Sequence, residues 1–252
     1  MDDIEAPASR SRSRSISTPS SDGLPTFDDL LPVRAPLTLP DEEKRLVIPG
    51  LDLDVKLKVD AGPGCGGIAW PAGEVLSRYL AYRHNQTALL ENKTILELGS
   101  GTGLVGIVAG ILEPSAKVWV TDQRQLLHLM KENVHLNLSP LHQSNVQVME
   151  LNWGETLPPN LPLKQIDLVL AADCVYFEPA FPLLVQTLRD LAMVNEHIEI
   201  LFCWKKRRKA DKRFFSLLKH HFHMDHVDDD RPNERERYQR EGISLLRLHR
   251  RH

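Results

Sequence analysis

The stretch TILELGSGTGLVGIVAG, residues 94–110, decides how the main fold of this chain begins. A short apolar run leads into the turn Gly99-Ser100-Gly101-Thr102-Gly103, and a second apolar run follows it. Glycines allow a tight turn and a close approach of the backbone to a ligand, and a following helix offers free N–H groups at its N-terminus. The stretch therefore predicts a strand, a ligand-binding loop and a helix.

Two overlapping glycine patterns in this stretch point to different cofactors. Gly101, Gly103 and Gly106 form G-x-G-x-x-G, which is typical of a turn that binds a dinucleotide. Read from Glu97, the pattern is E-x-G-x-G-x-G, and an acid at that position suits a ligand with an ammonium group better than one with phosphates. The glycines alone do not choose between a nicotinamide and another adenosine-bearing cofactor.

Strands and helices alternate on both sides of this stretch. Apolar segments typical of strands lie at 94–99, 117–122, 146–151, 166–173, 197–204 and 242–249. Segments with apolar residues at helical spacing lie at 70–83, 103–112, 125–138, 179–194 and 210–222. Strands that are apolar on both faces and alternate with helices predict an α/β fold with a mostly parallel sheet, covered by helices on both faces.

The N-terminal part of the chain divides into a tail and a hairpin. Residues 1–40 are rich in Ser, Arg, Pro and Asp and include SRSRSRS at 9–15, so we expect a disordered tail. Two short strands, at 45–50 and 53–60, flank Pro49-Gly50 and predict a β-hairpin. We therefore expect a single domain over residues 41–252 that begins with this hairpin.

Composition excludes several classes of protein. The chain has 252 residues and a formal net charge of −3, so it has no overall basic field for binding nucleic acid. No apolar run reaches the roughly 20 residues that span a bilayer, and the N-terminus lacks the apolar segment of a secretion signal. The three cysteines form no CxxC pair, and the histidines of 220–226 form no metal-site pattern. We expect a cytoplasmic protein without a metal, a membrane partner or a nucleic-acid partner.

The basic run WKKRRKADKR, residues 204–213, has several interpretations. It is typical of a solvated helix start, and it could also be a nuclear signal or a nucleic-acid patch. The acidic DHVDDD at 225–230 argues against binding of RNA, but a basic patch could still help to dock a protein substrate.

Polar and aromatic residues follow the predicted strands, where a parallel sheet binds its ligands. Asp122 ends one strand and could accept hydrogen bonds from both hydroxyls of a ribose, or cap a helix. Trp153 follows another strand and could pack on an adenine or in the core. Asp173 and Tyr176 follow a third strand and could orient an attacking nucleophile, or act as a helix cap and a packing residue. These strand ends converge on one crevice.

With these residues in order, the chain resembles a known family. ELGSGTGLVG, TD, LNWG and AADCVYFEP, preceded by GGIAWPAGEVLSRYL, are similar to motifs of the seven-β-strand (class I) methyltransferases. Trp70-Pro71, Leu151-Asn152-Trp153-Gly154 and Asp173-x-x-Tyr176 narrow the resemblance to the protein-lysine methyltransferases of family 16. Within that family, the fungal enzymes that methylate elongation factor 1-alpha are the most similar. The resemblance covers residues 44–250 and implies a Rossmann-like sheet of seven strands.

The resemblance also implies a cofactor, S-adenosylmethionine, and a set of site residues. Asp173 and Tyr176 would border the lysine channel, where Asp173 could hold the amine by a hydrogen bond and Tyr176 could limit the methylation degree. The residues implied in cofactor binding are Trp70, which would close over the cofactor, Glu97 at its ammonium end, Gly99, Ser100, Gly101 and Gly103 in the loop, Asp122 at the ribose, Trp153 at the adenine and Ala172 through its backbone.

We therefore predict a monomeric protein-lysine methyltransferase whose substrate is elongation factor 1-alpha. The alternatives are methylation of another protein, such as a chaperone or an AAA ATPase, methylation of RNA or a small molecule, a non-catalytic binding protein, and a nicotinamide dehydrogenase.

Overall fold

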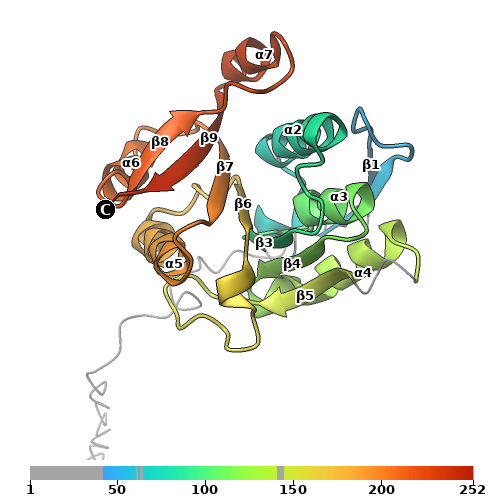
Figure 1. The fold of residues 1–252 in the computed structure, drawn as a ribbon, viewed down its shortest axis with the longest axis horizontal. Coiled ribbons are helices and arrows are strands. Elements are labelled where there is room, and N and C mark those ends of the chain that lie inside the picture. The colour runs from blue at the N-terminus through green and yellow to red at the C-terminus, as the bar shows by residue number, and fades with distance from the viewer. Residues whose placement is uncertain (1–41, 61, 63–64, 141–144, 252) are drawn as a thin grey trace, which may run out of the picture.

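The computed structural model describes residues 42–60, 62, 65–140 and 145–251, so the predicted tail of residues 1–40 lies outside the described residues. Seven strands of the main domain belong to one sheet, drawn in Figure 1. They are β3 (Thr94–Leu98), β4 (Lys117–Asp122), β5 (Val146–Glu150), β6 (Leu168–Ala172), β7 (Glu199–Lys205), β8 (Phe222–His226) and β9 (Ile243–Arg250).

The spatial order of the strands is β5-β4-β3-β6-β7-β9-β8. The pairs β4–β5, β3–β4, β3–β6 and β6–β7 are parallel, whereas β9 runs antiparallel to both β7 and β8. The predicted Rossmann-like, seven-stranded, mostly parallel sheet is therefore confirmed.

Helices cover both faces of the sheet, as predicted. The helices α2 (Pro71–Thr87), α3 (Leu104–Leu112) and α4 (Leu127–Asn137) share one hydrophobic core with Ile95 of β3. On the opposite face, α5 (Phe181–Val194) and α6 (Asp211–Leu218) share a second core with Leu96 and Leu98. Successive residues of a strand point to opposite faces, so a central strand covered on both sides must be apolar throughout.

The strand order places a topological switch point between β3 and β6. From β3 the chain winds outward to β4 and β5, and it then returns to β6 on the other side of β3 and continues to β7. At such a point the connections after the two central strands diverge to opposite faces and leave a crevice at the carboxyl ends. The glycine loop follows β3, and Asp173 follows β6, so both lie at this crevice.

An antiparallel pair of strands, β1 (Glu42–Leu46) and β2 (Val55–Val59), packs beside α4. Asn133 accepts a hydrogen bond of 2.7 Å from the backbone N–H of Lys58, and Asn137 accepts one of 2.8 Å from Lys56. The first strand lies a few residues earlier than the stretch 45–50 that the sequence indicates, because the chain turns at Pro49 and Gly50. The extent of the domain stays a prediction.

Two C-terminal elements were not predicted from the sequence. The segment expected to be helical to residue 222 leaves the helix at Leu218, and Phe222 begins β8. The helix α7 (Glu234–Arg240) lies between β8 and β9, at the top of Figure 1, and buries only Tyr238. Both are rich in charged residues and histidine, so their apolar periodicity is weak, and their positions depend on the pairing of β8 with β9.

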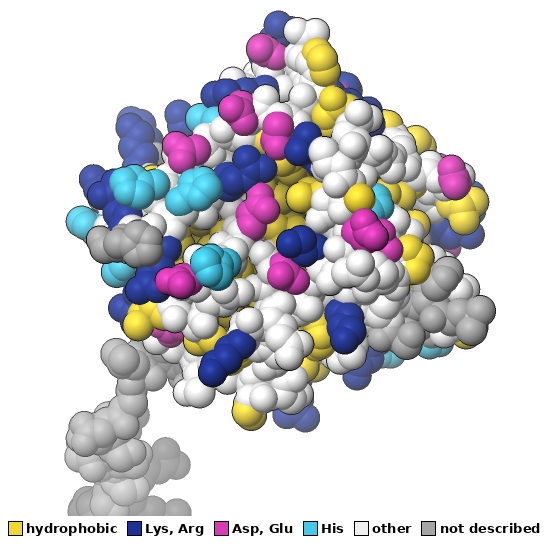
Figure 2. Space-filling view, in the orientation of Figure 1, with side chains coloured by type: hydrophobic (Ala, Val, Ile, Leu, Met, Phe, Trp, Pro, Cys, Tyr) yellow, Lys and Arg dark blue, Asp and Glu magenta, His cyan; other side chains and the backbone are white. Residues whose placement is uncertain are grey.

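The surface carries charges of both signs. In Figure 2, basic, acidic and histidine side chains lie interspersed over the face of the molecule that is drawn. Within the described ranges, none of the helices combines the length and the apolar character that crossing a membrane requires.

Candidate functional site

The glycine loop after β3 depends on three residues in the left-handed backbone region. Gly99, Gly101 and Gly103 have φ values of 60°, 58° and 81°. Ser100 ties the loop to β4, since its backbone N–H donates to the carbonyl of Thr121 at 3.0 Å and its Oγ accepts from the backbone N–H of Thr121 at 2.9 Å. The loop is thus held in a fixed shape at the end of the sheet.

Glu97 lies directly under this loop and is 2% exposed. Its Oε2 accepts a hydrogen bond of 2.9 Å from the backbone N–H of Gly106 in α3. Burial raises the pKa of this carboxyl to about 8, although hydrogen bonds from Gly106, Ser100 and Val105 act in the opposite direction. A cationic group placed beside it would stabilise the charged form.

Asp122 connects the end of β4 to the same loop. Its Oδ2 accepts a hydrogen bond of 2.8 Å from the backbone N–H of Gly101, and its Oδ1 accepts one of 2.7 Å from Gln123. Burial raises its pKa to about 6. The N-cap of α4 is Leu126, so the alternative in which Asp122 caps that helix is wrong. One carboxylate oxygen accepts up to two hydrogen bonds, which leaves Asp122 capacity for a ligand.

Trp153 lies in the hydrophobic core and also lines the cavity, so its position agrees with both roles that the sequence offered. It is 7% exposed and belongs to the core on the α5 side of the sheet. Its ring also packs against Gly99, where an added Cβ would lie 2.7 Å from Trp153 Cζ2. The same side chain lines the cavity above the loop.

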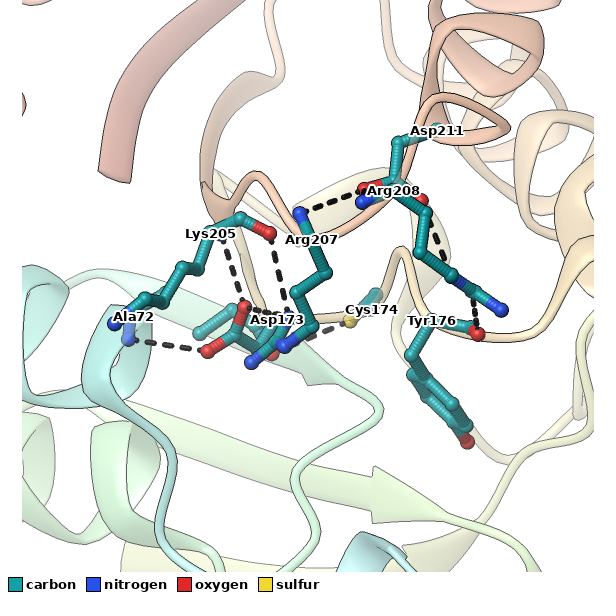
Figure 3. Close-up of polar contacts among 9 residues, drawn as sticks. Ala72, Asp173, Cys174, Tyr176, Lys205, Arg207, Arg208 and Asp211 are labelled. Carbon is teal, nitrogen blue, oxygen red and sulfur yellow. Dashed lines mark hydrogen bonds and ion pairs between the residues drawn. The ribbon is translucent and has the colours of Figure 1, made fainter. Parts of the chain in front are cut away.

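Asp173 joins three elements at the end of β6 (Figure 3). Its Oδ2 accepts a hydrogen bond of 3.1 Å from the backbone N–H of Ala72 in the first turn of α2. Its Oδ1 accepts hydrogen bonds from the backbone N–H of Lys205 at 3.0 Å and from Arg207 Nη1 at 2.8 Å. The side chain is 3% exposed, and its backbone φ of 56° is unusual for a residue other than glycine.

The sequence offered a helix cap as the alternative role of Asp173, and these contacts show that Asp173 does cap a helix. That helix is α2, which lies about a hundred residues earlier in the chain. The side chain of Trp70, the N-cap residue of α2, does not cap the helix, and the carboxylate of Asp173 instead accepts from the backbone N–H of Ala72 in the first turn. Three of about four acceptor positions of the carboxylate are occupied, and one position on Oδ2 remains for a further donor.

Trp70, Ala172 and Tyr176 complete the predicted set, and all three line the same cavity. Trp70 lies under the guanidinium of Arg207, whose Cζ is 5.0 Å from the ring centroid. The backbone carbonyl of Tyr176 accepts a hydrogen bond from Arg208, and Figure 3 shows its ring directed away from Asp173. Ten of the eleven residues that the sequence singled out therefore line one cavity, and Gly103 is the one that does not.

The space in and at the mouth of the cavity amounts to about 970 Å³, open solvent included. Its lining contains three carboxylates, two tryptophans and backbone of the glycine loop. These groups fit S-adenosylmethionine, which has a cationic methionine end, a ribose diol and an adenine. They fit a pyrophosphate less well, because Glu97 and Asp122 lie beside the loop that would have to hold the anion.

Among the lining residues that the sequence did not single out are Arg207, Cys174 and Gly66. Arg207 lies in the basic run, where charge alone does not reveal an inward-facing side chain. Cys174 is 3% exposed, and its Sγ donates to the carbonyl of Leu98 at 3.3 Å, while burial raises the pKa of its thiol. The carbonyl of Gly66 lies 2.3 Å from where a Cβ of Gly101 would be, so this upstream segment closes over the loop. None of these contacts follows from sequence spacing.

A family model described as lysine methyltransferase matches residues 51–221. The protein-lysine N-methyltransferase EFM6 of Saccharomyces cerevisiae is 41% identical over 214 residues, which are 77% of this chain and 85% of the yeast protein. The protein N-lysine methyltransferase METTL21A of Danio rerio is 40% identical and covers 66% of this chain and 73% of its own length. EEF1A lysine methyltransferase 3 of Mus musculus is 33% identical over 192 residues, which are 75% of this chain and 78% of the mouse protein.

Among solved structures, the 16S rRNA methyltransferase RsmC of T. thermophilus, in complex with AdoMet and guanosine, has a TM-score of 0.57. It is 14% identical to this chain and covers 83% of it and 50% of the solved chain. At this level of identity the likeness shows the fold alone.

Proposed function

Because the chain belongs to the lysine methyltransferase family matched over residues 51–221, we propose that its substrate is a lysine of translation elongation factor 1-alpha. The chain is a protein-lysine N-methyltransferase that uses S-adenosylmethionine. The observation that supports the named substrate is the similarity over most of both chains to EEF1A lysine methyltransferase 3 of Mus musculus.

We assign the cofactor residues by the chemistry of the cavity. Glu97 pairs with the ammonium group of S-adenosylmethionine, and this pairing compensates the burial of its carboxylate. Asp122 accepts hydrogen bonds from the ribose hydroxyls, while Gly99, Ser100, Gly101 and Gly103 form the loop beneath. Trp153 packs at the adenine, Ala172 contributes its backbone, and Trp70 closes the front of the cavity.

S-adenosylmethionine supplies a methyl group that is already activated by its sulfonium, so the protein mainly has to orient and desolvate the lysine. A free lysine has a pKa of about 10.4, and only roughly one in a thousand is neutral near pH 7.4. Desolvation in the cavity lowers the pKa of the target lysine and increases the reactive fraction. The apolar walls of the cavity therefore contribute to catalysis by keeping water away from the lysine.

Asp173 and Tyr176 border the channel through which the lysine enters. The remaining acceptor position on Asp173 Oδ2 can hold the amine by one hydrogen bond, since its other positions bind Ala72, Lys205 and Arg207. The ring of Tyr176 forms a wall that limits how many methyl groups fit beside the amine. We further propose that the enzyme acts as a monomer in the cytoplasm.

The test is to incubate the protein with radiolabelled S-adenosylmethionine and a lysate of cells that lack the enzyme. We expect label in elongation factor 1-alpha, and mass spectrometry should place it on one lysine. Asp122→Ala is the matched control and should abolish labelling. Label in a different protein would replace the proposed substrate, and label only in RNA would contradict protein methylation.

A further inference from the structure

The basic run at 204–213 is attached to the segment that follows β6. Arg207 pairs with Asp173, Arg208 donates to the backbone carbonyl of Tyr176, and Arg213 pairs with Glu178. Asp211, at the start of α6, accepts hydrogen bonds from the backbone N–H groups of Arg207 and Arg208 at 2.9 Å and 3.0 Å. The side chains of Arg208 and Arg213 are 50% and 74% exposed and α6 begins within the run, in agreement with a solvated helix start, whereas Arg207 pairs with a buried carboxylate.

Arg207 alone of these arginines lines the cavity, and it touches two of its walls at once. Its Nη1 lies 2.8 Å from Asp173 Oδ1, and its guanidinium covers the ring of Trp70 at 5.0 Å. The side chain is 26% exposed, whereas that of Asp173 is 3% exposed. Figure 3 shows the guanidinium directed inward from the segment after β7 to the carboxylate.

The pairing matters for the chemistry of an amine. A carboxylate beside a lysine stabilises the ammonium form and raises the pKa of the lysine, which opposes methyl transfer. A guanidinium that already neutralises the carboxylate removes this effect, and it adds a positive charge near the amine. Asp173 can then accept a hydrogen bond from the lysine without holding it in the charged form.

We propose that Arg207 is a positioning residue that neutralises Asp173, so that the substrate lysine enters as a neutral amine, and that also holds Trp70 over the cavity. This inference rests on the proposed lysine methylation at the same site. Arg207 acts on the lysine through Asp173 and on the cofactor through Trp70, and these two effects can be separated by substitution.

Other titratable groups surround the same space and stay unchanged in the test. They are Glu97 of β3, Asp122 of β4, and Cys174 and Tyr176 after β6, which line the cavity, together with Lys205 and Arg208, which lie within two residues of Arg207 in the chain.

The experiment compares wild type, Arg207→Gln, Arg207→Lys and Lys206→Gln with a protein substrate that the wild type methylates. The first measurement is the pH dependence of kcat, which reports groups in the enzyme–substrate complex. We expect Arg207→Gln to move the midpoint of the rising limb up by about one pH unit and to lower kcat about tenfold near pH 7.5. Arg207→Lys keeps the charge and should leave the midpoint in place.

The second measurement is the affinity for S-adenosylhomocysteine by calorimetry. Both substitutions of Arg207 should weaken binding by about threefold, because neither glutamine nor lysine places a planar guanidinium over Trp70. Lys206→Gln removes a charge from the same segment at an exposed position and should change neither the midpoint nor the affinity.

Two results would overturn the inference. One is a folded Arg207→Gln variant whose kcat midpoint does not shift. The other is a Lys206→Gln variant whose midpoint shifts as much as that of Arg207→Gln, because the effect would then come from the loss of any positive charge in this segment. If Arg207→Gln does not fold, the test rests on Arg207→Lys. An Arg207→Lys variant that binds S-adenosylhomocysteine as tightly as wild type would contradict the role of Arg207 at Trp70. A wild type that methylates no lysine would instead contradict the proposed function.

Discussion

At Gly101 the backbone φ is 58°, and an added Cβ would lie 2.3 Å from the carbonyl oxygen of Gly66. Two separate physical constraints therefore require glycine at this position. The left-handed conformation costs about 1–2 kcal/mol for a residue with a Cβ. The contact with Gly66 adds to this, because a backbone carbonyl has to move rather than a flexible side chain.

Gly101→Ala should therefore lower the free energy of unfolding by more than about 2 kcal/mol and weaken S-adenosylmethionine binding at least tenfold. Urea unfolding and calorimetry measure the two effects. Gly73→Ala is the control, because Gly73 is helical and its added Cβ would meet only side chains, at 3.5 Å and 3.8 Å. That change should leave stability unchanged or raise it by up to about 1 kcal/mol. Equal behaviour of the two variants would contradict the argument.

Glu97 makes the stability of the cofactor-free protein depend on pH. Burial raises its pKa from 4.5 to about 8, so the folded state binds more protons than the unfolded state between these values. The free energy of unfolding contributed by this group is therefore highest at low pH and falls as pH rises toward 8. A glutamine keeps an acceptor for the N–H of Gly106 and has no charge to bury.

We expect Glu97→Gln to gain stability relative to wild type as pH increases from 5 to 8, measured by urea unfolding without cofactor. The exposed Glu91→Gln serves as the control, and its stability should run parallel to that of wild type over the same range. Parallel curves for Glu97→Gln would mean that the buried carboxyl does not hold its proton.

At the scale of elements, a polar network connects α2, β7 and β9 on the side away from the glycine loop. Tyr79 Oη donates to Asp229 at 3.0 Å and accepts from Arg247 Nη2 at 3.0 Å. Arg247 also pairs with Glu199 at 2.7 Å, and Arg83 pairs with Asp229 at 3.1 Å. Because α2 begins at Pro71, directly after Trp70, this network fixes the helix whose first turn borders the cavity.

Tyr79→Phe should lower the free energy of unfolding by about 1–3 kcal/mol, because it removes the buried hydroxyl that bonds to both Asp229 and Arg247. The pairs Arg83–Asp229 and Arg247–Glu199 remain in this variant. Chemical denaturation gives the value. Tyr82→Phe, in the same helix, keeps the ring that lies under Arg231 and should stay within about 0.5 kcal/mol of wild type. A neutral Tyr79→Phe would show that solvent replaces the hydroxyl.

For the whole molecule, ligand binding and stability are linked, because the cavity is built from segments far apart in the chain. Residues from 66 to 207 line it, so only the folded protein can bind the cofactor. S-adenosylhomocysteine at a hundred times its Kd should add about 2.7 kcal/mol and raise the Tm by about 5–10 °C. NAD should leave the Tm unchanged, and Asp122→Ala should lose the response. Differential scanning calorimetry measures the shift, and an equal rise with NAD would contradict the choice of cofactor.

The sequence by itself determined the alternation of strands and helices and the glycine loop. It also placed Glu97, Asp122, Trp153 and Asp173 at strand ends. These features are local, because apolar periodicity and glycine conformation depend on neighbouring residues. Parallel strands then bring their carboxyl ends to one edge, so spacing along the chain was enough to predict one crevice. The motifs downstream of the glycines separated a methyl donor from a nicotinamide.

Only the tertiary structure decided what each side chain contacts. The pairing of β8 with β9, the capping of α2 by Asp173 and the inward direction of Arg207 all join residues distant in the sequence. A charged residue has the same local pattern whether it faces solvent or a buried carboxylate. The difference arises from the desolvation of the partner, which exists only once the sheet and its helices are packed.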